Sequence, residues 1–366
     1  MHIMLIVPSL EAGGAEHVAA LMGNYWRARN QQVTLLTYDD GAVPPFYDLD
    51  PLVRHIPLSI ARDSGNSLQG LWNNLKRIRA LRSAIRQCAP NIIISFMDST
   101  NVVTLLATRG LGIPVLVSEH VEPTIHSIPK VWKRLRLWAY PSADAIIVLS
   151  QRSVNYFKPR LRSKVRVIPN PVVTPPESSP SAGPFLRRPA VIAMGRLVEQ
   201  KGFDLLLHAF ARVKDAHPQW TLTILGEGPL RQELETLRSS LGLLDRVYLP
   251  GQIKNPYHIF NEADLFVMSS RYEGFPLVLC EAMACGLPVI STDCPTGPQE
   301  IIVNNVSGIL VPNEDVKALA AAMSRLMSDE QERKRIAASA RLVRAQFGIE
   351  KVMKMWEDLI EQVLRD

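Results

Sequence analysis

The sequence predicts an α/β protein made of two Rossmann-like domains, each a doubly wound parallel sheet, that face a cleft. The chain of 366 residues is long enough for two domains with a full core each. Short apolar runs alternate with helical patterns along its length, as expected of strands that crossover helices bury on both faces. A segment rich in proline and serine, residues 171–189, interrupts the alternation near the middle and predicts a linker.

The apolar runs define the expected strands. In the N-terminal domain, residues 1–170, strands are expected at 3–7, 33–37, 92–95, 115–118, 145–149 and 165–168, and helices at 15–29, 68–87 and 130–140. In the C-terminal domain, residues 190–348, strands are expected at 190–194, 222–225, 247–249, 265–268, 289–291 and 309–311. Residues 349–366 should form a helix that packs back on the N-terminal domain. Ligands of such sheets bind beyond the carboxyl ends of the strands, so functional residues should directly follow strands.

The composition excludes several classes of protein. Apolar residues make up 47% and charged residues 21%, which is ordinary for a globular protein in water. The four cysteines form no C-x-x-C pair, which argues against a zinc or redox site. The apolar start ends at Pro8 and is too short for a secretory signal or a membrane span. We therefore expect a cytoplasmic protein that begins with a buried strand.

The charge is unevenly placed. Residues 1–170 carry a net charge of +9 and residues 171–366 a net charge of −3. A basic half predicts an anionic partner, namely a membrane surface, a phosphorylated acceptor or nucleic acid. No nucleic-acid-binding module is visible, so nucleic acid is not expected. Neutral drift of surface charge is the alternative explanation.

Two basic residues follow the strand expected at 190–194. Arg196 offers a bidentate guanidinium and Lys201 a compact positive charge, while Gly195 and Gly202 allow backbone to approach a ligand. The N-terminus of the next helix adds a positive field. Together they suit a diphosphate, although solvated loop cations would give the same pattern.

Two glutamates follow the strand expected at 265–268. On a helix that begins near Phe275, Glu281 lies almost two turns in, so that Glu273 can face a sugar while Glu281 meets a ribose diol. Backbone N–H groups at 274–277 could hold a phosphate. A helix cap plus a surface charge is the alternative. The chain has no G-x-G-x-x-G fingerprint for a nicotinamide cofactor at either Gly13-Gly14 or Gly226-Glu227-Gly228.

These motifs come in a specific order and spacing along the chain. The series consists of Gly13-Gly14-Ala15-Glu16, Asn170-Pro171, Gly195-Arg196 with Lys201-Gly202, Gly226-Glu227-Gly228-Pro229, Glu273-Gly274-Phe275-Pro276 with Glu281-Ala282, and Gly286-Leu287-Pro288-Val289-Ile290. The series resembles the retaining glycosyltransferases of family 4, which have the GT-B fold. The resemblance covers nearly the whole chain. Residues 293–300 are similar to a subgroup that extends lipid-linked oligosaccharides or exopolysaccharides.

The resemblance implies a reaction and a donor site. A hexose or N-acetylhexosamine would move from a nucleotide-diphosphate sugar, with UDP preferred to GDP, to a glycan acceptor that is linked to polyprenyl diphosphate. By resemblance, Arg196 and Lys201 neutralise the diphosphate, Glu281 binds the ribose and Glu273 lies near the sugar. The further donor-binding positions are Gly13, Gly14, Asn170, Gly226, Ile253, Gly274, Phe275, Pro276 and Leu277. A sugar-nucleotide epimerase and a non-catalytic nucleotide-sugar-binding subunit are the alternatives on this scaffold.

The catalytic candidates are His120 and Glu273. His120 follows the strand expected at 115–118, and the resemblance places a histidine here at the reaction centre, in contact with the donor sugar. It need not be a general base, because the departing phosphate can take the acceptor proton in retaining enzymes of this fold. The neighbouring Glu119 is the alternative polar group.

Two basic segments of the N-terminal domain suggest an acceptor or lipid surface. Arg79, Arg82 and Arg86 share one helical face beside an apolar stripe, and residues 130–138 combine cations with two tryptophans. Such helices could bind anionic lipid or an acceptor diphosphate, which predicts an enzyme attached peripherally to the inner face of the cell membrane. Surface helices with solvated charges are the alternative.

No cofactor or metal is expected. A D-x-D string occurs at Asp48 and Asp50, but three nearby prolines place it in a surface loop. Enzymes of the GT-B fold generally use basic residues where others use a metal, so the nucleotide sugar is the only co-substrate expected.

Overall fold

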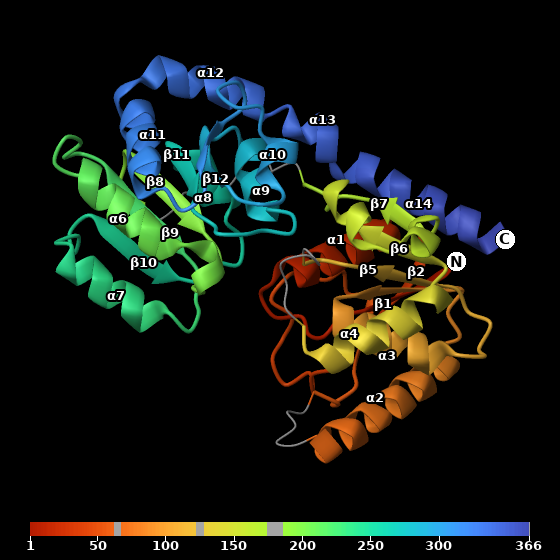
Figure 1. Ribbon diagram of the computed structural model, residues 1–366. Coiled ribbons are helices and arrows are strands. Elements are labelled where there is room, and N and C mark those ends of the chain that lie inside the picture. The colour runs from red at the N-terminus through yellow and green to blue at the C-terminus, as the bar shows by residue number, and fades with distance from the viewer. Residues whose placement is uncertain (62–66, 122–127, 174–185, 366) are drawn as a thin grey trace. The chain divides into compact units, whose positions relative to one another are not determined.

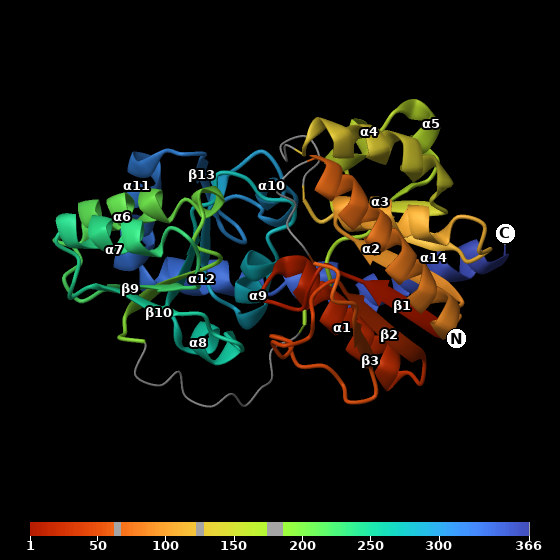
Figure 2. The same cartoon turned by 90° about the horizontal axis from the view of Figure 1, so that it is seen from below.

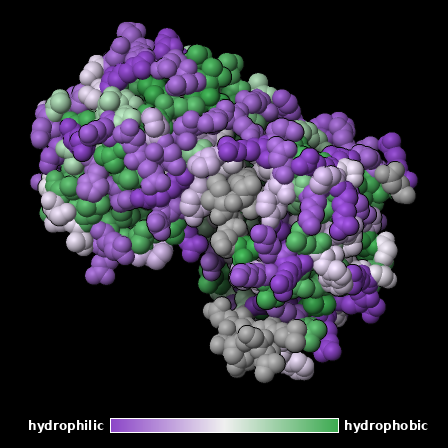
Figure 3. Space-filling model, in the orientation of Figure 1, coloured by the Kyte–Doolittle hydropathy of each residue, from purple (hydrophilic) through white to green (hydrophobic). Residues whose placement is uncertain are grey.

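The chain divides into two compact units in a computed structural model that describes residues 1–61, 67–121, 128–173 and 186–365 (Figure 1). Unit 1 consists of Met1–Pro171 with the segment from Val352, and unit 2 of Val172–Lys351. Most of the expected linker lies outside the described residues. Hydrophilic and hydrophobic residues are interspersed on the visible surface of each unit (Figure 3).

Unit 1 is built on a sheet in which every described strand pair is parallel. Its strand order is β3-β2-β1-β4-β5-β6-β7. The strands are β1 His2–Ile6, β2 Gln32–Thr37, β3 Arg54–Pro57, β4 Ile92–Phe96, β5 Val115–Ser118, β6 Ala145–Val148 and β7 Val165–Val167. The helices are α1 Gly14–Ala28, α2 Ser67–Cys88, α3 Asp98–Thr108, α4 Lys130–Ala139, η1 Tyr140–Ser142, η2 Arg152–Tyr156 and α5 Pro159–Arg162.

The helices of unit 1 cover both faces of the sheet. Helices α2, α3 and α4 lie side by side over one face, with α3 between the other two (Figures 1 and 2). Helix α1 covers the opposite face. The central strands β1 and β4 are buried along their length, and apart from His2 and Ser95 their side chains are apolar toward both layers of helices.

Unit 2 has a second parallel sheet, with strand order β10-β9-β8-β11-β12-β13. Its strands are β8 Ala190–Met194, β9 Thr221–Leu225, β10 Val247–Gly251, β11 Leu265–Met268, β12 Val289–Asp293 and β13 Ile309–Pro312. Its helices are η4 Glu199–Lys201, α6 Phe203–Val213, α7 Arg231–Ser240, α8 Tyr257–Glu262, α9 Leu277–Cys285, α10 Pro298–Ile301, α11 Val316–Ser328, α12 Glu330–Ala340 and α13 Val343–Phe347. The last helix, α14 Ile349–Arg365, begins in unit 2 and continues in the segment that belongs to unit 1.

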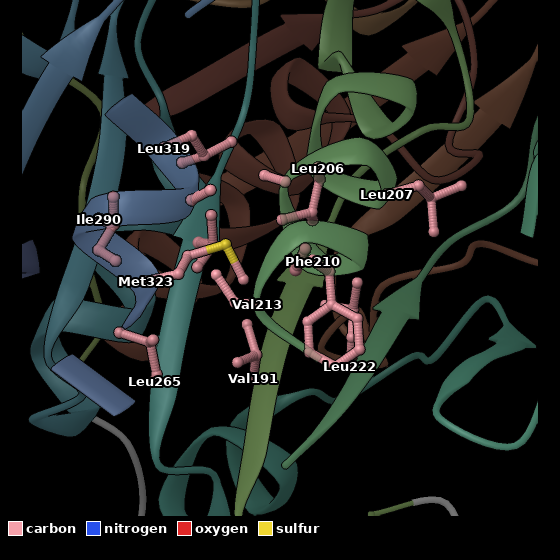
Figure 4. Close-up of a cluster of buried hydrophobic side chains, with 14 of the residues drawn as sticks. Val191, Leu206, Leu207, Phe210, Val213, Leu222, Leu265, Ile290, Leu319 and Met323 are labelled. Carbon is pink, nitrogen blue, oxygen red and sulfur yellow. The ribbon is translucent and has the colours of Figure 1, made fainter. Parts of the chain in front are cut away.

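The core of unit 2 shows how its helices are held. Leu206 and Phe210 of α6 and Met323 of α11 lie over strand residues such as Val191 and Leu265 (Figure 4). These side chains are almost completely shielded from solvent. Fully burying an aliphatic or aromatic side chain contributes about 1.5–3 kcal/mol, so this cluster fixes the loops that leave the sheet's carboxyl edge.

The sequence-based element boundaries agree closely with the structure, with two exceptions. The edge strand β3 was not expected, because its sequence Arg54-His55-Ile56-Pro57 has no apolar run and pairs on one side only. Helix α9 begins at Leu277 rather than near Phe275, because Pro276 occupies the cap. Glu281 therefore lies one turn into the helix, not two. In both sheets the strand order reverses between the first strand and the fourth, which is where doubly wound folds bind ligands.

Candidate active-site residues

Glycines line the carboxyl edge of the unit 2 sheet. Gly195 and Gly226 follow β8 and β9, and Gly251 ends β10. Gly226 has φ +146°, and a Cβ there would lie 1.9 Å from the carbonyl oxygen of Gly195. At Gly228 a Cβ would lie 2.4 Å from the carbonyl oxygen of Leu197. Only glycine fits both positions, so the turns that follow β8 and β9 pack closely against each other at this edge.

Lys201 and Glu273 form a shielded ion pair at this edge. The Nζ of Lys201 lies 2.6 Å from Oε1 of Glu273, and the Ser270 hydroxyl donates to the same oxygen at 2.6 Å. Glu273 is buried, and Lys201 is only partly exposed. Two predicted donor-site residues, 72 positions apart in the sequence, are thus brought into direct contact.

The loops that carry this pair are joined by further hydrogen bonds. Gln200 donates through its side chain to the carbonyl of Tyr272 at 2.9 Å, and the Ser269 hydroxyl donates to the carbonyl of Lys201 at 2.9 Å. Arg271 binds both carboxylate oxygens of Asp204 at 2.9 and 2.7 Å. The positive charge is therefore held in place before any ligand arrives, which electrostatic stabilisation requires.

Arg196 differs from Lys201 in being free to move. Its side chain is exposed and makes no hydrogen bond or ion pair within the described part of the chain. It can thus reach a bound anion with its bidentate fork, whereas Lys201 offers a fixed charge.

Glu281 is a deeply buried carboxylate on α9. Only 5% of the residue is exposed, and the Tyr257 hydroxyl on α8 donates to its Oε1 at 3.4 Å. Burial, partly offset by the hydrogen bond from Tyr257, raises the pKa of Glu281 to about 8. The carboxyl group thus stays largely protonated at neutral pH until a hydrogen-bond donor stabilises the anion.

The segment before α9 packs on the loop after β12. The Thr296 hydroxyl donates to the carbonyl of Glu273, and a Cβ at Gly297 would lie 2.6 Å from Cδ of Pro276. Gly274, Phe275 and Leu277 belong to this packed segment, at the N-terminal end of α9. Ile253 is half-buried on the loop that follows β10.

In unit 1, Gly13 ends the loop between β1 and α1, and Gly14 is the first residue of α1. The carboxylate of Glu16 folds back over Gly13, where its Oε2 would lie 2.1 Å from a Cβ, whereas nothing lies within 4 Å of a Cβ at Gly14. Asn170 is buried near the end of the first segment of this unit. The predicted donor-site residues are therefore divided between the two units.

His120 is the second residue after β5 in unit 1. Its Nε2 is 3.2 Å from the Ser118 hydroxyl, and its ring centroid is 5.1 Å from that of Phe96. Burial lowers the pKa of His120 to about 3, so the imidazole is neutral at physiological pH. Its other ring nitrogen can form a hydrogen bond with a ligand, but the ring carries no positive charge.

The three predicted acceptor arginines of α2 have different surroundings. Arg79 and Arg86 are exposed. Arg82 instead donates to the carbonyls of Ala107 at 2.6 Å and Arg109 at 2.8 Å, at the C-terminal end of α3. A cation there satisfies helix-end carbonyls, so Arg82 has a structural task that its place on the helical face did not reveal.

The D-x-D string lies in a loop that packs on α1. Asn24 donates to the carbonyl of Asp48 at 2.8 Å and accepts from the backbone N–H of Asp50 at 2.8 Å. Within the described ranges, no group of three or more His, Cys, Asp or Glu side chains is placed to hold a metal ion.

Three polar contacts of the site were not anticipated. Ser270 and Thr296 bind Glu273, and Tyr257 binds Glu281. Ser270 is the second residue after β11, so the rule that ligands bind beyond strand ends could have indicated it. Thr296 comes from the loop after β12 and Tyr257 from the start of α8, and neither has a local sequence signature.

Comparisons with known proteins match both units. Residues 12–175 match the family model described as glycosyltransferase family 4, and residues 176–343 match that of glycosyl transferases group 1. A relative from Campylobacter jejuni is 30% identical over 364 residues, covering 99% of each chain; it is GalNAc-α-(1→4)-GalNAc-α-(1→3)-diNAcBac-PP-undecaprenol α-1,4-N-acetyl-D-galactosaminyltransferase. The amylovoran biosynthesis glycosyltransferase AmsD of Erwinia amylovora is 28% identical and covers 98% of this chain and 99% of its own.

Solved structures confirm the expected fold class. Sucrose-phosphate synthase from Thermosynechococcus elongatus has a TM-score of 0.84 at 23% identity, covering 100% of this chain and 99% of that one. The HepE protein of Anabaena in complex with UDP has a TM-score of 0.76 at 21% identity, covering 99% of this chain and 100% of that one. These likenesses place both parallel sheets within the GT-B fold.

Proposed function

The chain belongs to glycosyltransferase family 4, and from this premise we propose that it transfers a hexose or N-acetylhexosamine from a nucleotide-diphosphate sugar to a glycan, with retention of anomeric configuration. The observation that carries the donor assignment is the fixed Lys201–Glu273 pair at the glycine-lined edge of unit 2. The UDP held by the HepE relative supports UDP in preference to GDP.

The charges of unit 2 suit a departing diphosphate. Lys201 and Arg196 stabilise the negative charge that develops on the phosphate oxygen as the sugar–phosphate bond breaks. Glu281 accepts hydrogen bonds from the ribose hydroxyls, and Glu273 orients Lys201 beside the donor sugar. The acceptor hydroxyl forms the new bond to the anomeric carbon from the face that the phosphate leaves, and its proton passes to the phosphate oxygen. Neutral His120 contributes a hydrogen bond to the donor sugar.

The relatives suggest the class of acceptor. The Campylobacter jejuni enzyme is named for a glycan on undecaprenyl diphosphate, and AmsD for the synthesis of a polysaccharide. We propose a glycan linked to polyprenyl diphosphate as the acceptor. The donor is tested by thermal shift of the purified protein with a panel of UDP- and GDP-sugars, followed by transfer of the best ligand to a synthetic acceptor. Stabilisation by nucleotide sugars with hydrolysis or isomerisation but no transfer would favour an epimerase instead.

Transfer should not depend on a metal ion. Lys201, Arg196 and the helix N-terminus of α9 supply the positive charge that a metal would otherwise provide. We expect the transfer rate to be unchanged in excess chelator, measured after exhaustive dialysis. Loss of transfer in chelator, with recovery in Mg²⁺ or Mn²⁺, would overturn this expectation and direct attention to Asp48 and Asp50.

A surface of unit 1 suits an anionic bilayer. Helix α4 exposes Val131 at 66%, Leu137 at 42% and Trp138 at 52%, beside exposed Lys133 and Arg134. Helix α2, which packs against the same helix α3 as α4 does, adds Trp72, 54% exposed, and the exposed cations Lys76, Arg79 and Arg86. Apolar side chains among cations are typical of interfacial helices. No described helix combines the length and the apolar character needed to span a bilayer. We propose peripheral attachment to the inner face of the cell membrane.

Liposome flotation tests this attachment. Each cation near an anionic leaflet contributes about 1 kcal/mol, so changing Arg79, Arg86, Lys133 and Arg134 to Glu should abolish flotation at low salt. Arg82 is left intact because it binds carbonyls of α3. The matched control reverses four exposed cations of unit 2, namely Arg212, Lys317, Lys334 and Lys351. Binding should require anionic lipid and weaken with salt. An equal loss of flotation in the control variant would contradict the proposed membrane attachment, and so would a wild-type protein that does not bind anionic liposomes.

A further inference from the structure

A buried polar network joins the ends of β5 and α4 in unit 1. Its centre is Glu119, which is 4% exposed and directly precedes His120. The Tyr140 hydroxyl donates to Oε1 of Glu119, and a terminal nitrogen of Arg136 lies 3.5 Å from the same oxygen. Asn101 donates to the Tyr140 hydroxyl at 3.2 Å and to the carbonyl of Ser118 at 3.0 Å. The network thus binds both the residue before His120 and the strand that leads to it.

Arg136 is a buried cation on α4, a surface helix whose other cations are exposed. It is 5% exposed, although it belongs to the basic segment whose other cations face solvent. Its guanidinium donates to the Tyr156 hydroxyl and lies 4.9 Å from the centroid of that ring. Burying two charges is expensive, and a well-packed apolar pair would hold α4 at least as firmly. A buried pair at this place therefore calls for a role beyond anchoring the helix.

His120 itself is loosely held. Within the described part of the chain, its only side-chain hydrogen bond is the 3.2 Å contact with Ser118. By contrast, Glu119 is fixed through its carboxylate and through its backbone N–H, which donates to the carbonyl of Ile147 at 2.9 Å. Where His120 lies consequently depends on how its neighbour is fixed.

We propose that Glu119 is a positioning residue for His120, and that Arg136 and Tyr140 hold it in place from the end of α4. This proposal rests on the proposed role of His120 at the donor sugar. Glu119 need not touch any substrate. Its carboxylate acts through the backbone, by fixing the direction in which the chain leaves β5.

The network should depend on pH. The pKa of Glu119 is raised to about 7: burial and, less strongly, Asp98 at the start of α3 raise it, while Arg136 and Tyr140 partly offset this rise. Arg136 and Tyr140 bind the ionised carboxylate, so the network is complete above this value and weakened below it. His120 cannot cause a change there, because its pKa is about 3. At saturating donor, kcat should therefore rise with pH through about 7 to a plateau.

Three variants test the proposal, namely Glu119→Gln, Arg136→Met and Tyr140→Phe. In each we expect kcat to fall roughly 10- to 100-fold while the KM for the nucleotide sugar changes little. A small misplacement of His120 slows the reaction more than it weakens binding of the donor in unit 2. In Glu119→Gln the rise of kcat near neutral pH should vanish. The double variant Glu119→Gln with Arg136→Met removes both charges and should recover the wild-type melting temperature without recovering kcat.

The outcomes separate this proposal from the proposed function. Wild-type kcat and an unchanged pH profile in Glu119→Gln would overturn the positioning role even if His120→Ala is inactive. Recovery of kcat together with stability in the double variant would also overturn it, since the network would then be structural. Full activity in His120→Ala would instead refute the role of His120, independently of the three network variants.

Discussion

Replacing Lys201 by methionine should lower kcat by about 100- to 1000-fold, the usual loss when one preorganised donor to a developing negative charge is removed. Methionine keeps the packing of the lysine stem, whose Cγ, Cδ and Cε lie 3.3 Å from the place of a Cβ on Gly195. The change therefore removes a charge with little change in shape. Single-turnover rates at saturating donor measure the loss.

The same variant should also lose stability, and this must be separated from the catalytic effect. Glu273 would keep the hydrogen bond from Ser270 but lose its counter-charge, which costs about 3 kcal/mol for a buried carboxylate. Adding Glu273→Gln removes the unpaired charge and should restore most of the free energy of unfolding, but not the rate. If the double variant recovers both, Lys201 acts only as the partner of Glu273.

A matched control is available within unit 2. Arg188 and Asp264 form an ion pair of the same 2.6 Å length, but both residues precede their strands and so lie at the amino edge of the sheet. Arg188→Met should leave kcat unchanged. A Lys201→Met rate close to that of Arg188→Met would mean that the diphosphate is bound elsewhere.

The sequence predicted most of the fold because its strands are short and buried on both faces. Strands such as β5, β8 and β11 begin and end where their apolar runs do. The edge strand β3 was not predicted, because it contains Arg54 and Pro57, which are tolerated where one side of a strand is unpaired. Apolar periodicity reports burial, so it is weakest where burial is incomplete.

The candidate site was predictable only to the level of residue type and position after a strand. The motif order indicated Lys201 and Glu273, but not that they form an ion pair with each other. The basic pattern of residues 130–138 likewise suggested that all four cations face a lipid surface, whereas Arg136 turns inward to Glu119. Which way a long cation points depends on a partner distant in the sequence, and a local pattern contains no information about that partner.

Binding of the nucleotide sugar should release a proton near neutral pH, because of Glu281. The carboxyl group has a pKa of about 8 in the free protein, so it is mostly protonated at pH 7. Two ribose hydroxyls that donate to it would stabilise the anion and lower this pKa. The buried thiols of Cys280 and Cys285 beside it do not release a proton in this pH range. Burial raises the pKa of Cys285 to about 12 and that of Cys280 well above its usual value.

The ionisation of Glu281 affects affinity and stability in opposite directions. As pH increases, affinity for the ligand should rise and the stability of the free protein should fall. Below the bound-state pKa both forms are protonated and pH has no effect; between it and about 8, affinity should rise by up to about tenfold per pH unit. The free protein, in contrast, should lose unfolding free energy as pH rises from the ordinary value of 4.5 through about 8, because the folded state disfavours the anion. Melting temperatures with and without ligand should therefore diverge as pH increases.

Calorimetry with Glu281→Gln decides whether the carboxylate meets the ribose. The ligand should be an intact nucleotide sugar, because its diphosphate is fully ionised and does not exchange protons near neutral pH. Titrations in two buffers of different ionisation enthalpy should show proton release for the wild type and none for Glu281→Gln, whose donor KM should rise roughly 10- to 100-fold with a smaller change in kcat. A donor with 2′-deoxyribose provides the matched control: it removes one hydroxyl from the ligand and should weaken binding to the wild type far more than to Glu281→Gln. If both proteins discriminate equally against the deoxy donor, Glu281 does not bind the ribose, and its burial beside Tyr257 serves only the packing of α8 on α9.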